Sequence, residues 1–234
     1  MTTILPPPEE KAAAVQHMFD RIAPSYDRAN RMMTFGMDQR WRRTLLANLN
    51  IQSGDVVLDL ATGTGDFAQM VSETAGARVV GLDFSRGMLL AARQRRAAGV
   101  ELVQADGLRL PLADQSVDIA VSGFALRNFS SIPPVLAELA RVVKPGGRIG
   151  FLEVDRPRNP LIRAGHALYF ERLVPVLGGM LSHDRPAYRY LPKSAVYLPE
   201  EHQLVRMLQD AGFHHLQKAR PMFGAIQTLR AVRT

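Results

Sequence analysis

The chain has 234 residues, 47% of them hydrophobic, so it can bury a sizeable core and is not a disordered chain. It has no cysteine, which excludes disulfide bonds and thiolate chemistry. Its net charge is +7. A positively charged surface can bind nucleic acid, an anionic membrane or an acidic substrate, but it is equally explained by ordinary charged residues that face the solvent.

The first predicted elements along the chain are helices. Residues 10–23 are rich in helix formers, and Pro24 is expected to stop that helix. A second helix is indicated by apolar residues at helical spacing, namely Met37, Trp41, Leu45 and Leu49. The opening residues lack the basic and apolar regions of a secretory signal, and no apolar run is long enough to span a membrane.

From residue 54 onward, strand and helix patterns alternate. Strands are predicted at residues 55–61, 78–84, 100–106, 117–124 and 148–154. Helices are predicted between them at residues 66–76, 85–99 and 133–147. Asp66 and Ser85 are expected to be the N-caps of the first two helices. This alternation predicts a parallel sheet that is covered by helices on both faces.

The remainder of the chain first breaks this pattern and then resumes it. Residues 156–197 are long for a connection, so we interpret them as a functional insertion. A helix is predicted at 199–213, and the runs 214–222 and 225–233 are close enough to form an antiparallel pair. The predicted fold is therefore α/β, with a sheet of about seven mostly parallel strands and an antiparallel last strand.

The turn after the first predicted strand has the sequence GTGDFA, at residues 63–68. It nominally fits the dinucleotide pattern G-x-G-x-x-G/A, which alone is a weak signal. A pyrophosphate would bind at the N-terminus of the next helix, but Asp66 occupies that place and Asp59 precedes the turn. Two carboxylates disfavour a diphosphate and favour a cation. The expected ligand is therefore S-adenosylmethionine, which carries a sulfonium and an ammonium group.

Further acids end the next two predicted strands, at the same edge of the sheet. Asp83 is placed to accept hydrogen bonds from the ribose hydroxyls, and Asp106 from the adenine amine. Phe84 and Met88 are expected to pack against the adenine ring, and Asp59 to orient the turn or hold the ammonium group. The turn residues that let the backbone approach the ligand are Gly63, Thr64 and Gly65. Each acid alone is more often a turn or cap residue, but their common position favours the nucleoside.

Several separated motifs carry a resemblance to known enzymes: MFDRIAPSYDRANRMMTFGMDQRWRR (18–43), DLATGTGD (59–66), FALRNF (124–129) and YRYLPKSAVYLP (188–199). With them, the chain resembles the class I S-adenosylmethionine-dependent methyltransferases. It is similar, more closely, to the ubiquinone/menaquinone biosynthesis C-methyltransferase family over residues 16–234. The resemblance implies a single Rossmann-like domain made of a helical cap (11–50), a cofactor-binding core (54–154), a substrate lid (156–197) and a C-terminal helix and hairpin (199–234).

The resemblance also implies an activity and a set of cofactor contacts. The activity is methylation of a ring carbon of a prenylated quinol, with demethylmenaquinol becoming menaquinol, or with a benzoquinol as acceptor in some organisms. By motif position, the cofactor contacts fall on Thr64, Asp83, Asp106 and Gly107. A further contact is a serine just before LRN in relatives, and here either Ser122 or Gly123 takes that place.

Ring methylation needs a nucleophilic ring carbon. Deprotonation of the quinol hydroxyl next to that carbon increases its electron density and makes it nucleophilic. An arginine can stabilise the resulting phenolate, so Arg127 and Asn128 are the expected catalytic residues, although Arg127 is also explained as a surface arginine. The expected substrate contacts are Tyr26, Tyr188, Tyr190 and Glu153. Tyr188 and Tyr190 would share one face of an extended segment, but they are equally explained as packing aromatics, and Glu153 as a strand-end acid.

The isoprenoid tail of such an acceptor implies a membrane-borne substrate. We therefore expect a cytoplasmic protein in peripheral contact with the inner face of the cell membrane, through the apolar run 161–181 and the arginines, unless that run is lid core. No metal ion and no nucleic-acid partner are expected, and a homodimer is left open. The rival functions are methylation of a soluble phenolic or sugar metabolite, and non-catalytic nucleic-acid binding.

Overall fold

The computed structural model describes residues 5–7, 9–73, 76–95, 97–169, 172, 174 and 184–234. Its strands are β1 (Val56–Leu60), β2 (Arg78–Asp83), β3 (Val100–Gln104), β4 (Val117–Gly123), β5 (Val143–Val154), β6 (Phe213–Ala219) and β7 (Ile226–Arg233). Its helices are α1 (Lys11–Ile22), α2 (Tyr26–Met33), α3 (Met37–Ala47), α4 (Asp66–Ser72), α5 (Arg86–Gln94), α6 (Ile132–Val142), α7 (Pro160–Leu168), α9 (Arg185–Lys193) and α10 (Glu201–Asp210). Short 3₁₀ turns are η1 (Ala23–Ser25), η2 (Leu126–Asn128), η4 (Ser194–Tyr197) and η5 (Met222–Gly224).

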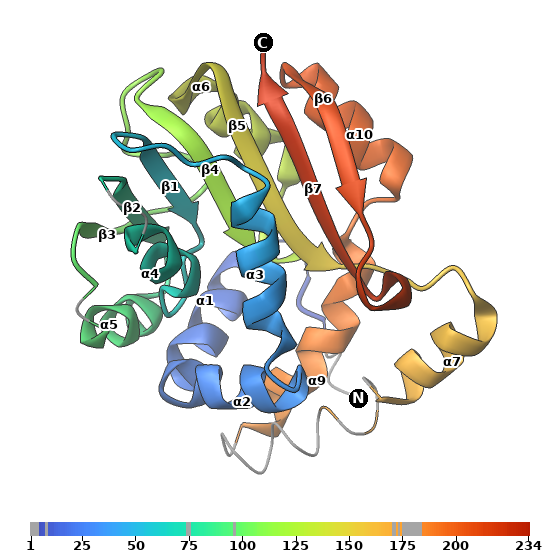
Figure 1. Cartoon of the computed structure of the whole chain (residues 1–234). Coiled ribbons are helices and arrows are strands. Elements are labelled where there is room, and N and C mark those ends of the chain that lie inside the picture. Colours follow the sequence, from blue (N-terminus) through green and yellow to red (C-terminus); the bar gives the residue numbers. More distant parts are fainter. Residues whose placement is uncertain are drawn as a thin grey trace.

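The described strands form one seven-stranded sheet in the order β3-β2-β1-β4-β5-β7-β6 (Figure 1). Strands β1 to β5 pair in parallel, and β7 runs antiparallel to both of its neighbours, β5 and β6. The prediction of a mostly parallel sheet with an antiparallel last strand is therefore confirmed. The order reverses between β1 and β4, which is where an open α/β sheet binds its ligands.

Each face of the sheet is covered by helices. Successive residues of β1 point to opposite faces, so Val57 and Leu58 belong to different apolar clusters. Leu58 packs in a cluster with α6 and α10, through residues such as Leu136 and Leu204. Val57 packs in a cluster with α3 and α4 on the other face, through residues such as Leu45. Figure 1 shows α3 in front of the sheet and α6 and α10 behind it.

A third apolar cluster lies beyond the carboxyl ends of the parallel strands. It joins α1, α2, α5 and α9, with Ile22, Met88 and Tyr188 at its centre. Figure 1 shows α1, α2 and α9 together below the strand ends, although α9 is far from α1 in the sequence. We call α1 and α2, with η1 between them, the cap, because they cover this edge of the sheet.

The structure confirms one local prediction and corrects two others. Pro24 does stop α1, but it sits in the first turn of η1, where its missing N–H is tolerated, and the chain continues directly into α2. The KPGG segment begins β5 instead of ending the preceding helix, which already stops at Val142. The segment with Tyr188 and Tyr190 is helix α9 and not an extended strand, because Asp184 caps it by accepting a hydrogen bond from the Ala187 N–H.

Candidate functional site

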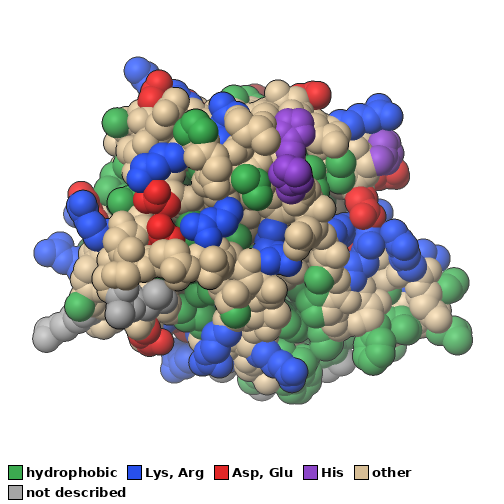
Figure 2. Space-filling view, turned by 45° about the horizontal axis from the view of Figure 1, so that its top comes forward, with side chains coloured by type: hydrophobic (Ala, Val, Ile, Leu, Met, Phe, Trp, Pro, Cys, Tyr) green, Lys and Arg blue, Asp and Glu red, His purple; other side chains and the backbone are tan. Residues whose placement is uncertain are grey.

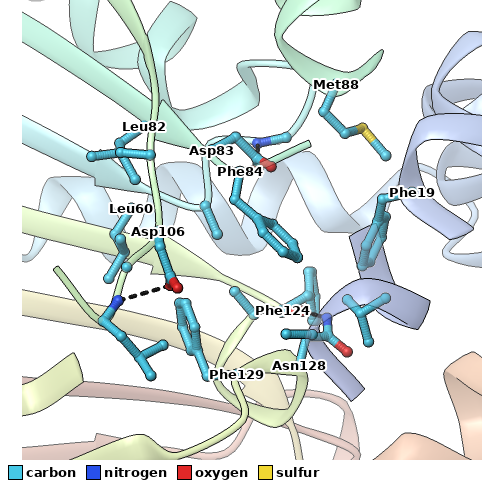
Figure 3. A pocket seen from close by; sticks show the side chains of 18 of the residues that line it. Phe19, Leu60, Leu82, Asp83, Phe84, Met88, Asp106, Phe124, Asn128 and Phe129 are labelled. Carbon is cyan, nitrogen blue, oxygen red and sulfur yellow. Dashed lines mark hydrogen bonds between the residues drawn. The ribbon is translucent and has the colours of Figure 1, made fainter. Parts of the chain in front are cut away.

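A cavity of about 90 Å³ lies at the carboxyl ends of the strands, between the sheet and the cap. We call it the strand-end cavity (Figure 3). The sheet and its loops contribute Leu60, Leu82, Asp83, Asp106 and Phe129, among others. The cap contributes Ala12, Val15, Phe19 and Tyr26, and sequence reasoning missed the first three because nothing local marks them as ligand-facing.

Asp83 lies in the wall of this cavity and is held by the backbone. Its two carboxylate oxygens accept hydrogen bonds from Gly63 N and Ser85 N, each at 2.8 Å. Burial raises the pKa of Asp83 to about 6, despite those hydrogen bonds. A carboxylate has about four acceptor positions, which is more than these backbone contacts occupy, so acceptor capacity remains for a ligand hydroxyl.

Asp106 lies on another side of the cavity, and the loop that carries it is tightly packed. Its carboxylate is exposed and accepts a hydrogen bond from Leu108 N at 3.0 Å, drawn dashed in Figure 3. A Cβ on Gly107 would lie 2.7 Å from the Phe129 ring, so glycine is needed for that ring to pack here. Phe84 and Met88 also line the cavity, as expected, and Figure 3 shows the Phe84 ring between Phe129 and Phe19.

The glycine turn is built around Asp59. This buried carboxylate accepts hydrogen bonds from Thr62 Oγ1 at 2.5 Å and from Ala68 N at 3.0 Å. It therefore orients the turn, which is one of the two roles left open by the sequence. Burial raises the pKa of Asp59 to about 7. The backbone φ angles of +57° at Gly63 and +86° at Gly65 explain why glycine stands at both places.

Three cofactor candidates at the glycine turn, namely Asp59, Thr64 and Gly65, are not among the residues that line the strand-end cavity. Asp59 and Thr64 line a smaller neighbouring cavity of about 30 Å³, the glycine-turn cavity. Gly65 is the residue before α4 and packs against Ala92. Gly63 lines both cavities, as does Ala61 just before it.

The structure distinguishes Ser122 from Gly123. The Ser122 side chain is buried and donates a hydrogen bond to Leu60 O at 2.7 Å, which ties β4 to β1. Gly123 lines both the strand-end cavity and the glycine-turn cavity. A Cβ there would lie 2.8 Å from the Phe67 ring. Gly123 is therefore the residue of this pair that a ligand in the cavity would meet.

Asp66 is not the side-chain cap that the sequence predicted. Residue Gly65 precedes α4 and no side chain caps the helix. The Asp66 carboxylate instead contacts the guanidinium groups of Arg31, Arg42 and Arg95, at 2.8, 3.5 and 2.9 Å. Burial raises the pKa of Asp66, but the three arginines outweigh it and hold that pKa below its ordinary value. Its charge is therefore compensated within the protein.

Two further acids complete this group of contacts. Asp38, fully buried in α3, forms ion pairs with Arg31 and Arg42. Asp27 of the cap accepts hydrogen bonds from Arg95 at 2.6 Å and from Thr64 Oγ1 at 2.5 Å. We call Asp27, Asp38, Asp66 and the three arginines the arginine–aspartate network. It ties α2 and α3 to the glycine turn and to α5.

The cap is also fastened to the loops that frame the cavity. Lys11 Nζ donates to Phe129 O at 2.6 Å, and Gln16 Nε2 donates to Phe84 O at 2.8 Å. The Asp20 carboxylate accepts from Gly87 N at 2.8 Å and from the hydroxyl of Ser85, the N-cap of α5, as predicted. A Cβ on Gly87 would lie 2.9 Å from the Asp20 backbone, so the approach of the cap to α5 depends on this glycine.

A second, larger cavity of about 350 Å³ adjoins the first. We call it the apolar cavity, because most of its walls are apolar, including Met33, Trp41, Tyr169 and Phe223. Tyr26 and Phe124 line both cavities, and so form the junction between them. Phe124, at this junction, has a φ angle of +59°. Ala61, which lines the strand-end cavity, has a φ angle of +55°. Such strain in residues other than glycine is typical of functional sites.

Arg127 lines the apolar cavity and is not a surface arginine. It is buried, it forms an ion pair with Glu153, and its Nε donates to Ser194 Oγ at 3.0 Å. Glu153 is buried too, so burial raises its pKa, and the contact with Arg127 opposes that rise. The pair fixes the guanidinium group at the cavity wall.

The other catalytic and substrate candidates lie around Arg127. Asn128 lines the strand-end cavity, and its side chain donates to Phe124 O at 3.2 Å. Tyr190 donates a hydrogen bond to Asn128 Oδ1 at 3.3 Å. It does not line either cavity, so it supports Asn128 and is not placed to contact a ligand. Tyr188 is fully buried in the third apolar cluster. Because α9 is helical, the two tyrosines do not share one face, which corrects the expectation for them.

In the part of the chain that the structure describes, no group of three or more His, Asp or Glu side chains is arranged to hold a metal ion. Most of residues 170–183 lie outside the described residues, and they include the second half of the apolar run 161–181. No described helix is long and apolar enough to cross a membrane.

Comparisons with known proteins agree with this geometry. The model of the ubiE/COQ5 methyltransferase family matches residues 8–233. A demethylmenaquinone methyltransferase of Roseiflexus sp. (strain RS-1) is 43% identical, with 91% of this chain and 90% of that protein covered. A ubiquinone/menaquinone biosynthesis C-methyltransferase of Syntrophotalea carbinolica is 41% identical, with 91% and 90% covered.

Solved structures show the same fold at low sequence identity. A SAM-dependent methyltransferase from Thermotoga maritima has a TM-score of 0.67 at 20% identity, covering 94% of this chain and all (100%) of that chain. Another, from Aquifex aeolicus, has a TM-score of 0.61 at 18% identity, covering 82% and 89%.

The arginine–aspartate network predicts a large effect of Asp66→Asn on stability. The change leaves three arginines with one buried counter-charge fewer, so we expect the free energy of unfolding in urea to fall by about 3 kcal/mol. The matched control is Asp114→Asn, which breaks an ion pair with Arg141 in which the aspartate side chain is 73% exposed. That control should change stability by at most about 1 kcal/mol. Equal losses in the two variants would contradict a structural role for the network.

Proposed function

Because the chain belongs to the ubiE/COQ5 methyltransferase family, we propose that it transfers the methyl group of S-adenosylmethionine to a ring carbon of a prenylated quinol, converting demethylmenaquinol to menaquinol. The observation that carries this proposal is the junction of two unlike cavities. One has acids at its wall, the other is apolar, and they meet at Tyr26 and Phe124. A charged nucleoside and an apolar ring would therefore have their places side by side.

The strand-end cavity has the groups that S-adenosylmethionine requires. Asp83 has free acceptor positions for the ribose hydroxyls, and Asp106 is exposed to accept from the adenine amine. Phe84 and Met88 supply apolar surface for the base. When bound, S-adenosylmethionine supplies a methyl group on a positively charged sulfur. The protein then acts mainly by alignment of the two reactants, which is a large effect for in-line displacement.

The apolar cavity has the groups that a quinol requires. Its volume of about 350 Å³ and its apolar walls suit a fused ring and the start of a prenyl tail. Arg127 is held at the wall by Glu153 and Ser194, so its guanidinium group is fixed before the acceptor arrives. It would stabilise the phenolate that forms when a quinol hydroxyl gives its proton to water, and so increase electron density at the neighbouring ring carbon.

Tyr26 would act at the junction. Burial raises the pKa of its phenol group, so the group stays protonated at neutral pH and can donate a hydrogen bond. Its ring packs edge-on against Phe19, with centroids 6.0 Å apart, which fixes it between the two cavities. Opening of the cap would move Tyr26 with it, because the residue begins α2.

A direct test uses the protein, isotopically labelled S-adenosylmethionine and a chemically reduced short-tail demethylmenaquinone. We expect a product methylated at a ring carbon, identified by mass spectrometry and NMR. An O-methylated product, or methylation of soluble phenols with none of the quinol, would contradict the proposal.

Arg127→Ala should lower the rate of this reaction. Without the guanidinium group the phenolate loses its stabilising charge, so we expect kcat to fall by about tenfold or more. Arg127→Lys, which keeps the positive charge, should recover part of the rate, and Arg93→Ala, an exposed site on α5, should leave it unchanged. S-adenosylmethionine binding, measured by calorimetry, shows that each variant is folded. Wild-type kcat in Arg127→Ala would remove this residue from the mechanism.

Cofactor affinity should depend on pH through Asp83. Its pKa of about 6 means that the carboxylate is protonated as the pH falls below that value, and a protonated group accepts ribose hydroxyls and attracts a cation less well. We expect binding of S-adenosylmethionine to be about fourfold weaker at pH 5.5 than at pH 7.5. In Asp83→Asn, affinity should be lower at both pH values and the part of the dependence centred near pH 6 should disappear. Equal wild-type affinity at the two pH values would contradict this role.

A further inference from the structure

Exposed apolar side chains gather around the mouth of the apolar cavity. Nine large hydrophobic residues are exposed among the described residues, and seven of them lie in or directly after three elements. We call these seven the apolar rim: Met32 and Phe35 at the end of α2, Leu161, Ile162 and Leu168 on α7, and Met222 and Phe223 in η5. The three elements are neighbours, because Phe35, Ile162, Met222 and Phe223 line the same apolar cavity.

Helix α7 is apolar yet packs no side chain into the core. None of its residues is buried, and Leu161 is 84% exposed. A surface helix of a globular protein normally buries one apolar stripe. Figure 1 shows α7 projecting from the body of the protein beside the loop that joins β6 to β7. The helix therefore presents apolar surface outward, next to an opening that is itself apolar.

The backbone is strained at three residues of the rim. Phe35, Met222 and Phe223 have φ angles of +51°, +54° and +53°, a conformation that side chains larger than glycine rarely adopt. The rings of Phe35 and Phe223 are 76% and 79% exposed. Strained backbone at exposed aromatic residues costs stability without improving the core, so it points to a role in binding.

Positive charge borders the rim at α7. Residues 156–169 contain three arginines, Arg156, Arg158 and Arg163, and no acidic residue. All three are exposed. Within the described part of the chain, Arg158 forms an ion pair with Glu201 at 3.4 Å, and no ion pair is found for Arg156 or Arg163. Figure 2 shows basic side chains beside apolar ones at the lower right of the molecule. Apolar side chains bordered by arginines match a lipid bilayer with anionic head groups.

We propose that the apolar rim inserts into an anionic lipid bilayer, so that the apolar cavity opens directly onto the acyl chains. This inference rests on the proposed function, because it is the isoprenoid tail of the acceptor that makes such an opening useful. The ring of the acceptor enters the cavity past Phe35 and Phe223 while its tail stays in the bilayer. The arginines around α7 hold the protein at the head groups and set its orientation.

Sedimentation with vesicles tests the docking itself. Vesicles of phosphatidylcholine with phosphatidylglycerol are compared with vesicles of phosphatidylcholine alone, and we expect binding to the anionic vesicles that salt weakens. The variant Leu161→Asp/Leu168→Asp should bind about tenfold more weakly, since it puts charge into the inserted face. These leucines do not line the apolar cavity. The matched control, Leu90→Asp on α5, changes a leucine of 52% exposure outside the rim and should bind as the wild type does.

Two acceptors separate a failure of docking from a failure of the proposed function. The variant should methylate a detergent-free, short-tail demethylmenaquinol at the wild-type rate, and a long-tail acceptor embedded in anionic vesicles about tenfold more slowly. If the wild type methylates neither acceptor, the proposed function is wrong. If it methylates both and the variant equals it on vesicles, the docking inference is overturned. It is also overturned if the wild type ignores vesicles and forms a dimer that the variant cannot form, because a second copy then covers the rim.

Discussion

Closure of the cap over the strand ends is the constraint on which the rest of the site depends. A parallel sheet offers its loops and its acids at one edge, but an open edge is only a groove. Here α1 and α2 convert that edge into enclosed space, with Phe19 and Tyr26 as walls. The cap is held by charge rather than by apolar packing alone, because the arginine–aspartate network joins it to the glycine turn. The same contacts therefore hold in place the helix that begins with Tyr26, a residue that lines both cavities.

This arrangement also assigns the acids of the site to two different tasks. Asp59 and Asp66 flank the glycine turn in the sequence, yet both are engaged by the protein, one by Thr62 and the backbone, the other by arginines. Asp83 and Asp106 are the acids that line the strand-end cavity. A ligand there meets acceptors at the second and third strand ends, while the first strand end shapes the turn. At the apolar cavity an acid also serves the protein itself, because the buried Glu153 forms an ion pair with Arg127 and holds its guanidinium group in place.

The strand and helix order could be predicted from the sequence because those signals are local. Apolar runs, turn glycines and the Ser85 cap lie within a few residues of the elements they define. The partners of Asp66 could not be predicted, because Arg31 and Arg95 are far from it along the chain and meet it only after folding. Helix α9 was missed although its signal was present: Asp184 followed by Pro186 is typical of a helix start, but the tyrosine spacing suggested an extended segment. The cap residues of the strand-end cavity left no signal, since alanine, valine and phenylalanine on a helix are ordinary core residues.

A crystal structure of the protein with S-adenosylhomocysteine would test the central claim most directly, namely that nucleoside and acceptor occupy adjoining cavities under a closed cap. We expect the ribose at Asp83, the adenine between Asp106 and Phe84, and the thioether sulfur directed toward Tyr26 and Phe124, with the apolar cavity still open behind them. A nucleoside bound outside the strand-end cavity, or a sulfur directed away from the apolar cavity, would contradict it.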